Sequence, residues 1–213
     1  MDGHTLAAHG GHGDHHEIEI PYTVHARPDT GVYNGKLGIW LFLASEVMLF
    51  GALFSALILL RTGAPSWPHG YNVLNVPLAT VNTFVLIFSS VTVVLAWAYL
   101  RLGDLKKGKI FLALTLLCGL GFMVIKGIEY TTKFEHHLLP STNNFYGTYF
   151  VLTGLHGLHV LGGMVVFAYL LLTADKWYGA KRDQFTNRVE VTGLYWHFVD
   201  LVWIFLFPTL YLL

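Results

Sequence analysis

Three pairs of ionisable side chains stand three residues apart inside otherwise apolar stretches of the sequence. The pairs are His156 with His159, His197 with Asp200, and Lys126 with Glu129. Residues three apart share one face of a helix, so in each pair a donor and an acceptor can meet. Two polar groups that bond to each other in an apolar medium cost less free energy than two separate ones. The spacing therefore favours polar contacts inside a helix bundle.

Glu46 stands alone in its apolar stretch, next to Ser45 and Val47. A charged group at the centre of a bilayer costs roughly 2.5–3.5 kcal/mol on insertion scales. We therefore expect Glu46 either to be kept neutral by desolvation or to bond to another helix or subunit. A structural role and a proton-related role are both open for this carboxyl.

The composition is that of a membrane protein. Of 213 residues, 54% are hydrophobic and 12% are charged, whereas soluble domains carry about 25% charged residues. Five apolar runs each reach the ~20 helical residues that span a bilayer. They cover residues 37–60, 76–100, 110–134, 145–174 and 191–213. The runs do not alternate in polarity as barrel strands do, so we predict an all-α membrane protein with five transmembrane helices.

The distribution of Lys and Arg predicts the orientation of these helices. Ten of them flank the ends of the runs on the side of the N-terminus, against Arg61 and Lys133 on the other side, with Lys126 inside the third run. Cytoplasmic loops carry the excess of positive charge. We expect the N-terminus in the cytoplasm and the C-terminus outside.

The remaining organisation is simple. Residues 31–213 form the transmembrane domain, and residues 1–30 are a Gly- and His-rich polar tail that we expect to be flexible. Five histidines of the tail could bind a transition metal in an open chain: His4, His9, His12, His15 and His16. The single cysteine, Cys118, excludes an intrachain disulfide, and the zero net charge gives no reason to expect a nucleic-acid partner.

Helical rise places Glu46, Asp200 and His156 at similar depth near the middle of the membrane, so they form one layer. Lys126 and Glu129 lie beyond the middle, within reach of the outer interface if Lys126 extends toward water. Four functions stay open on the residues alone. They are a set of interhelical hydrogen bonds, haem ligation by the histidines, a zinc or copper site, and a proton relay in a small transporter or channel.

Five motifs resemble subunit III of the haem-copper oxidases, the terminal respiratory oxidases that reduce oxygen to water. The motifs are ASEVMLFGALFSA (44–56), PLATVNTFVLIFSS (77–90), GIEYTTKF (127–134), FYGTYFVLTGLHGLHVLGG (145–163) and EVTGLYWHFVDLVWIFLF (190–207). The resemblance covers nearly the whole chain from Gly35 onward. The last two motifs are long and specific.

The resemblance implies a subunit that carries no haem and no metal, the haems and copper being held by its partners. It implies direct packing against subunit I in a complex that also contains subunit II and a small subunit IV. It also implies ordered phospholipid between the helices. Support of proton uptake and protection during turnover are the implied roles. The five-span form is similar to that of bacterial cytochrome c and quinol oxidases, which implies a bacterial inner membrane and leaves the electron donor open.

The resemblance also extends to single positions. Glu46 matches the membrane glutamate of the SEV motif, which implies a proton-related role or a place at the subunit I interface. The matching members of an interhelical polar network are His156, His159, His197, Asp200, Glu129 and Glu190. Lys126 departs from the family, which has glutamine there, so a Lys126–Glu129 ion pair replaces a neutral hydrogen bond. The ending YLL lacks the aromatic-glycine end of longer forms.

Overall fold

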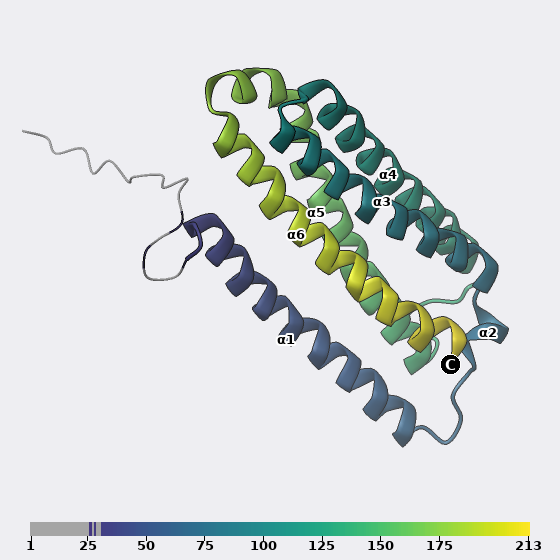
Figure 1. Cartoon of the computed structure of the whole chain (residues 1–213). Helices are drawn as coiled ribbons and strands as arrows, with labels where there is room; N and C mark the ends of the chain where they lie inside the picture. Colours follow the sequence, from purple (N-terminus) through teal and green to yellow (C-terminus); the bar gives the residue numbers. More distant parts are fainter. Residues whose placement is uncertain (1–25, 27, 29–30) are drawn as a thin grey trace, which may run out of the picture.

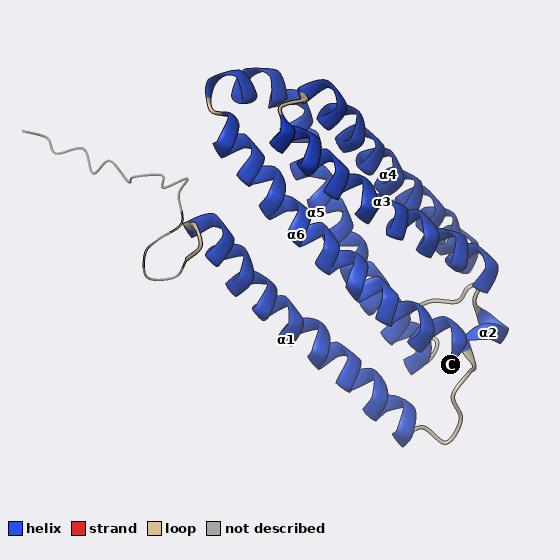
Figure 2. Ribbon diagram, viewed as in Figure 1, coloured by secondary structure: helices blue, strands red, loops and turns tan. Residues whose placement is uncertain are grey.

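The computed structural model describes residues 26, 28 and 31–213. The histidines of the tail, with the metal-binding alternative raised for them, lie outside the described residues. Five long apolar helices are each capable of crossing a membrane. They are α1 (Asn34–Gly63), α3 (Val76–Leu102), α4 (Leu105–Glu135), α5 (Asn144–Ala180) and α6 (Arg182–Phe207). The described part of the chain contains helices and loops but no strand (Figure 2).

Two shorter segments complete the fold. A single helical turn, α2 (Gly70–Val73), follows α1, and a π-helical segment, η1 (Pro208–Leu212), continues α6 toward the C-terminus. The five predicted spans correspond to the five long helices, but the last two helices are longer than their apolar runs. Lys181 alone separates α5 from α6. Lys176 and Arg188 therefore lie on helix ends and not in the connecting loop in which we had expected them.

Local signals start and stop the helices. The side chains of Asn75, Asp104 and Asn143 accept hydrogen bonds from backbone N–H groups in the first turns of α3, α4 and α5. The bond from the Lys107 backbone N–H lowers the pKa of Asp104, which lies outside the membrane segments. Gly103 ends α3 with φ +101°, a left-handed conformation that glycine adopts without strain. The chain thus turns tightly from α3 into α4.

Helix α6 is the centre of the bundle and α1 lies at its edge. Of the most apolar stretch of each helix, 50% is buried in α6 and 17% in α1. In Figure 1, α3 to α6 pack closely, whereas α1 runs beside them at a distance. The indole of Trp196 on α6 is fully buried. Glycines make room for it, since a Cβ at Gly163 would lie 2.8 Å from the Trp196 ring and one at Gly119 would lie 3.0 Å from it.

Candidate functional site: a polar layer between the helices

Glu46 on α1 meets His159 on α5. The distance from Glu46 Oε2 to His159 Nε2 is 2.9 Å, and the two side chains are 13% and 14% exposed. His159 Nδ1 lies 2.8 Å from the carbonyl oxygen of Leu155. A carbonyl only accepts hydrogen bonds, so Nδ1 carries a proton. The bond between Nε2 and Oε2 then holds one further proton, on either the imidazole or the carboxyl.

Aromatic side chains fix the His159 ring. Phe50 contacts it edge to face at a centroid distance of 5.2 Å, and Tyr195 stacks on it at 6.4 Å. The Tyr195 hydroxyl donates to the backbone carbonyl of His159 at 2.9 Å. Glu46 is therefore bonded to another helix of its own chain. The bond goes to the His159 ring, which its aromatic neighbours hold in one orientation.

His156 does not join its neighbour His159. Its imidazole is fully buried, and neither ring nitrogen has a hydrogen-bond partner within the described chain. The ring stacks on Trp203 at a centroid distance of 5.1 Å and meets the edge of Phe122 at 5.5 Å. This histidine is packed as an aromatic ring in the core.

His197 and Asp200 do not bond to each other either. His197 Nδ1 lies 2.6 Å from the hydroxyl oxygen of Ser90 on α3. Ser90 also faces the Asp200 carboxyl, yet neither carboxyl oxygen makes a hydrogen bond of normal geometry with any described residue. Ser90 is thus one polar link between α3 and α6, beside the bonds that the indoles of Trp196 and Trp203 donate to Ser89 and Thr83. A serine in an apolar run is also compatible with plain helix packing, so no sequence signal singled it out.

Lys126 and Glu129 form the one intrahelical pair of the three that makes direct contact. Lys126 Nζ lies 2.8 Å from Glu129 Oε2, and Lys126 is only 6% exposed. Tyr211 from η1 donates to Glu129 Oε1 at 2.8 Å and accepts a bond from Lys126 Nζ. The ammonium also lies 4.6 Å from the centroid of the Trp203 ring, a cation–π contact. Lys126 therefore points into the bundle. The sequence had also allowed its side chain to extend to the outer interface, and the structure does not place it there.

Glu190 ties the other end of α6 to α1. Its carboxyl accepts bonds from Lys36 Nζ at 2.7 Å and from the Tyr33 hydroxyl at 3.3 Å. At the far end of α1, Arg61 donates to the carbonyl of Leu213 at 3.2 Å. Together with the Glu46–His159 bond, these contacts attach the peripheral helix α1 near its start, middle and end.

The histidines do not converge on a common centre. Among the described residues, no group of three or more His, Cys, Asp or Glu side chains is placed to hold a metal ion. His156 is enclosed by aromatic rings, His159 is bonded to Glu46, and His197 is bonded to Ser90. The polar side chains of this site join the helices through contacts inside their apolar parts.

These features define a multi-pass α-helical membrane protein in which several buried polar side chains link the helices. The chain belongs to the cytochrome c oxidase subunit III family, whose family model matches residues 17–213. It is therefore subunit III of a haem-copper oxidase, as the motifs predicted, and part of a respiratory complex that contains other oxidase subunits.

Bacterial relatives cover almost the whole chain. It is 33% identical over 192 residues to the "Probable quinol oxidase subunit 3" of Staphylococcus aureus (strain USA300), with 90% of this chain and 94% of the relative covered. It is 33% identical over 202 residues to the "Quinol oxidase subunit 3" of Bacillus subtilis (strain 168), with 95% and 97% covered.

Proposed function

We propose that this chain is a cofactor-free accessory subunit of a proton-pumping oxidase. Oxygen is reduced to water in partner subunits, which hold the haems and copper. This chain binds subunit I directly, lies in one complex with subunit II and a small subunit IV, and supports proton uptake and durability during turnover. The excess of Lys and Arg around the N-terminal ends of α1, α4 and α6 supports an N-terminus in the cytoplasm of a bacterium and helices in its inner membrane.

The observation that carries the proposal is the Glu46–His159 pair. Because its internal bond holds a single proton, the pair can be an ion pair or two neutral groups with the same net charge. A proton can move between the two without placing net charge at bilayer depth. Groups of this kind serve as proton relays in membranes, and the pair links the outermost helix to the bundle.

The position of the pair supports a place at a subunit interface. Glu46 belongs to α1, and Met48, two residues further along this helix, is exposed. A partner helix packed there would lie one helix diameter from the carboxyl. We propose that subunit I covers this face and that Glu46 tunes proton delivery to it.

We also propose that this subunit binds phospholipid, and two grooves beside α1 support this part of the proposal. One of about 230 Å³ lies between α1 and α6 and is lined by Phe50, Phe54 and Phe205 among others. A second, of about 200 Å³, lies between α1 and α5 next to Leu53 and Gly147. The lining of both grooves is mainly apolar, which favours contact with acyl chains.

The remaining polar residues have a structural role in this proposal. The Lys126–Glu129–Tyr211 cluster, the Ser90–His197 bond and the Lys36–Glu190 pair hold the helices in register. His156 and Asp200 complete the interhelical network by packing. Buried groups of this kind specify a single arrangement of helices when they are bonded.

The experiment that tests the proposal uses Glu46→Gln in the assembled oxidase. The amide can donate to a neutral His159 Nε2, so the contact is kept while the exchangeable proton is removed. We expect normal assembly, with slower proton uptake or fewer turnovers before inactivation. The control is Ser45→Ala, since the Ser45 hydroxyl bonds only locally to the Phe42 carbonyl on the exposed face. If Glu46→Gln and Ser45→Ala were both indistinguishable from the unmodified oxidase, the proton-related role would be excluded.

A further inference from the structure

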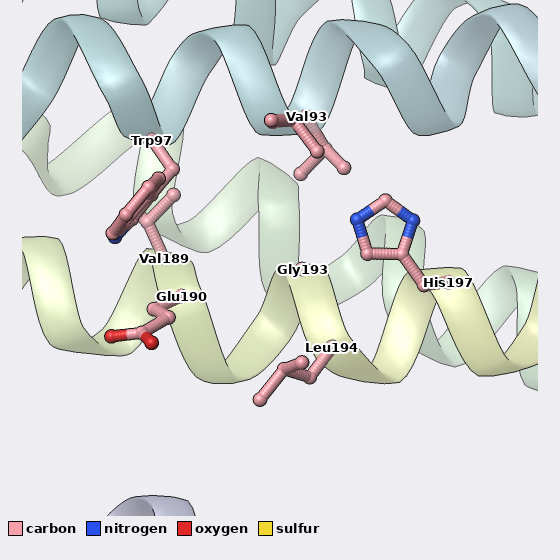
Figure 3. A pocket seen from close by; sticks show the side chains of 8 residues that line it. Val93, Trp97, Val189, Glu190, Gly193, Leu194 and His197 are labelled. Atoms are coloured by element: carbon pink, nitrogen blue, oxygen red, sulfur yellow. The ribbon is translucent and has the colours of Figure 1, made fainter.

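A pocket of about 180 Å³ lies between α3 and α6, near the end of α3 and the start of α6 (Figure 3). Its lining is mainly apolar and includes Val93 and Val94. Figure 3 shows the Trp97 ring and the Glu190 side chain at one end of the pocket and His197 at the other. The pocket is therefore an apolar recess that a side chain from outside α3 and α6 can enter.

The chain enters α1 beside this pocket. The Tyr33 hydroxyl, just before α1, donates to the Glu190 carboxyl at 3.3 Å, and Lys36 in the first turn of α1 pairs with the same carboxyl at 2.7 Å. The chain from Val24 to Tyr33 can span up to ~30 Å. From Glu190 to His197, the pocket extends only ~10 Å along α6. The residues that precede α1 are therefore long enough to reach every part of it.

The end of the pocket near α1 carries a cation without an acidic partner. The Arg101 guanidinium lies 5.9 Å from the centroid of the Trp97 ring. None of the carboxylates in the described part of the chain forms an ion pair with Arg101, and Glu190 is already neutralised by Lys36. This end of the pocket therefore has a net positive charge, which favours an acidic occupant.

Residues 17–24, with the sequence EIEIPYTV, have the matching composition. Glu17 and Glu19 alternate with Ile18 and Ile20, and alternate side chains of an extended chain point to opposite sides. The proline after Ile20 favours an extended backbone at that residue. The family model begins at residue 17, so this segment belongs to the matched part of the chain, whereas the Gly- and His-rich residues before it do not.

We propose that residues 17–24 bind across the ends of α3 and α6, with Ile20 in the pocket and Glu19 beside Arg101. The contact closes the pocket to lipid and ties the start of α1, the helix that carries Glu46, to α3. For these eight residues the inference replaces the flexibility expected of the whole tail. It concerns contacts within this chain and does not depend on the accessory role proposed above.

The first test is cleavage of the assembled oxidase by a glutamate-specific protease, followed by mass spectrometry of the released N-terminal peptides. Val94 lines the pocket and is 47% exposed, so Val94→Phe can fill the pocket without entering the core. It should speed cleavage after Glu17 and Glu19 about threefold to tenfold, because the displaced segment is open more of the time. Leu95→Phe, at the same depth on another side of α3, is the matched control and should have no effect.

The ionic contact is tested by the same assay. Arg101→Gln removes the cation and should speed cleavage about twofold to threefold, the effect of one exposed ion pair. Lys106→Gln removes a cation from the exposed start of α4 and should leave the rate unchanged. Equal rates for the two variants would show that Glu19 is not held by Arg101.

A disulfide tests the contact directly. Ile20→Cys combined with Val94→Cys, in a Cys118→Ser background, should give a linked peptide under mild oxidation while haem content and oxygen reduction are retained. A disulfide needs Cβ atoms about 3.5–4.5 Å apart, so Leu95→Cys in place of Val94→Cys should give little product. A lipid chain or a helix of another subunit in the pocket would leave the cleavage rate of Val94→Phe unchanged and prevent the disulfide. Absence of either effect would overturn the proposal.

Discussion

His159 donates through Nδ1 to the Leu155 carbonyl and meets Glu46 through Nε2 at 2.9 Å, so the two residues share one proton between α1 and α5. The bond crosses from the most peripheral helix to the bundle, where both partners are largely shielded. A buried partner left unbonded costs the full desolvation free energy, about 1–3 kcal/mol. The effect of a substitution at Glu46 on stability should therefore depend on whether the new side chain can bond to His159 Nε2.

Glu46→Leu should therefore destabilise the subunit by about 1–3 kcal/mol, because His159 Nε2 loses its partner. Glu46→Gln should cost less, since the amide can still bond. Thermal unfolding of the tagged chain in mild detergent measures both. Equal stability of the Leu and Gln variants would show that the bond contributes nothing to the attachment of α1.

Tyr211→Phe should loosen the end of α6. The hydroxyl bridges Lys126 and Glu129, and its loss leaves that buried pair short of a bond at a cost of about 1–3 kcal/mol. Tyr169, which is exposed on α5, provides the control Tyr169→Phe. The prediction fails if both variants melt at the temperature of the unmodified chain.

Substitutions of Lys126 should follow a definite order. Lys126→Met leaves the Glu129 carboxylate buried without its cation, a change that typically costs about 3–5 kcal/mol. Lys126→Gln keeps a donor next to Glu129 and should be milder. The yield of folded subunit after detergent extraction ranks the two, and a Met variant as stable as the Gln variant would contradict the ion pair.

Two glycines of α5 should respond in opposite directions. Gly163→Ala places a methyl group 2.8 Å from the Trp196 ring and should cost about 1–3 kcal/mol by overpacking. Gly157→Ala meets no atom within 4 Å, so the higher helix propensity of alanine should stabilise that variant by up to about 1 kcal/mol. Urea or thermal denaturation compares them directly, and a neutral Gly163→Ala would mean that α5 and α6 can separate at little cost.

The number and class of helices follow from the sequence, because uninterrupted apolar runs of this length have few alternatives to a membrane helix. Helix ends were harder to place. The ends of α5 and α6 carry polar residues such as Lys176 and Arg182, and hydropathy does not distinguish helix outside the membrane from loop. The sequence therefore predicted a longer connection between α5 and α6 than the single residue Lys181.

The sequence singled out polar residues inside the spans, but it predicted the partners of only some of them, and His156 and Asp200 have no hydrogen-bond partner among the described residues. Spacing along one helix gave Lys126–Glu129, which the structure contains. Glu46–His159 and Ser90–His197 join different helices, and such pairs depend on how each helix is rotated about its axis. Tyr211 was missed because a tyrosine near the end of a span is equally typical of the membrane interface.

The most direct test of the accessory role is purification of the complex in mild detergent through a tag on this chain, with a reduced-minus-oxidised spectrum and mass spectrometry of the proteins that co-purify. We predict haem signals that follow a co-purified large subunit and disappear when this chain is isolated. Haem retained by the isolated chain would mean that His156, His159 or His197 is a ligand, and the cofactor-free role would be wrong.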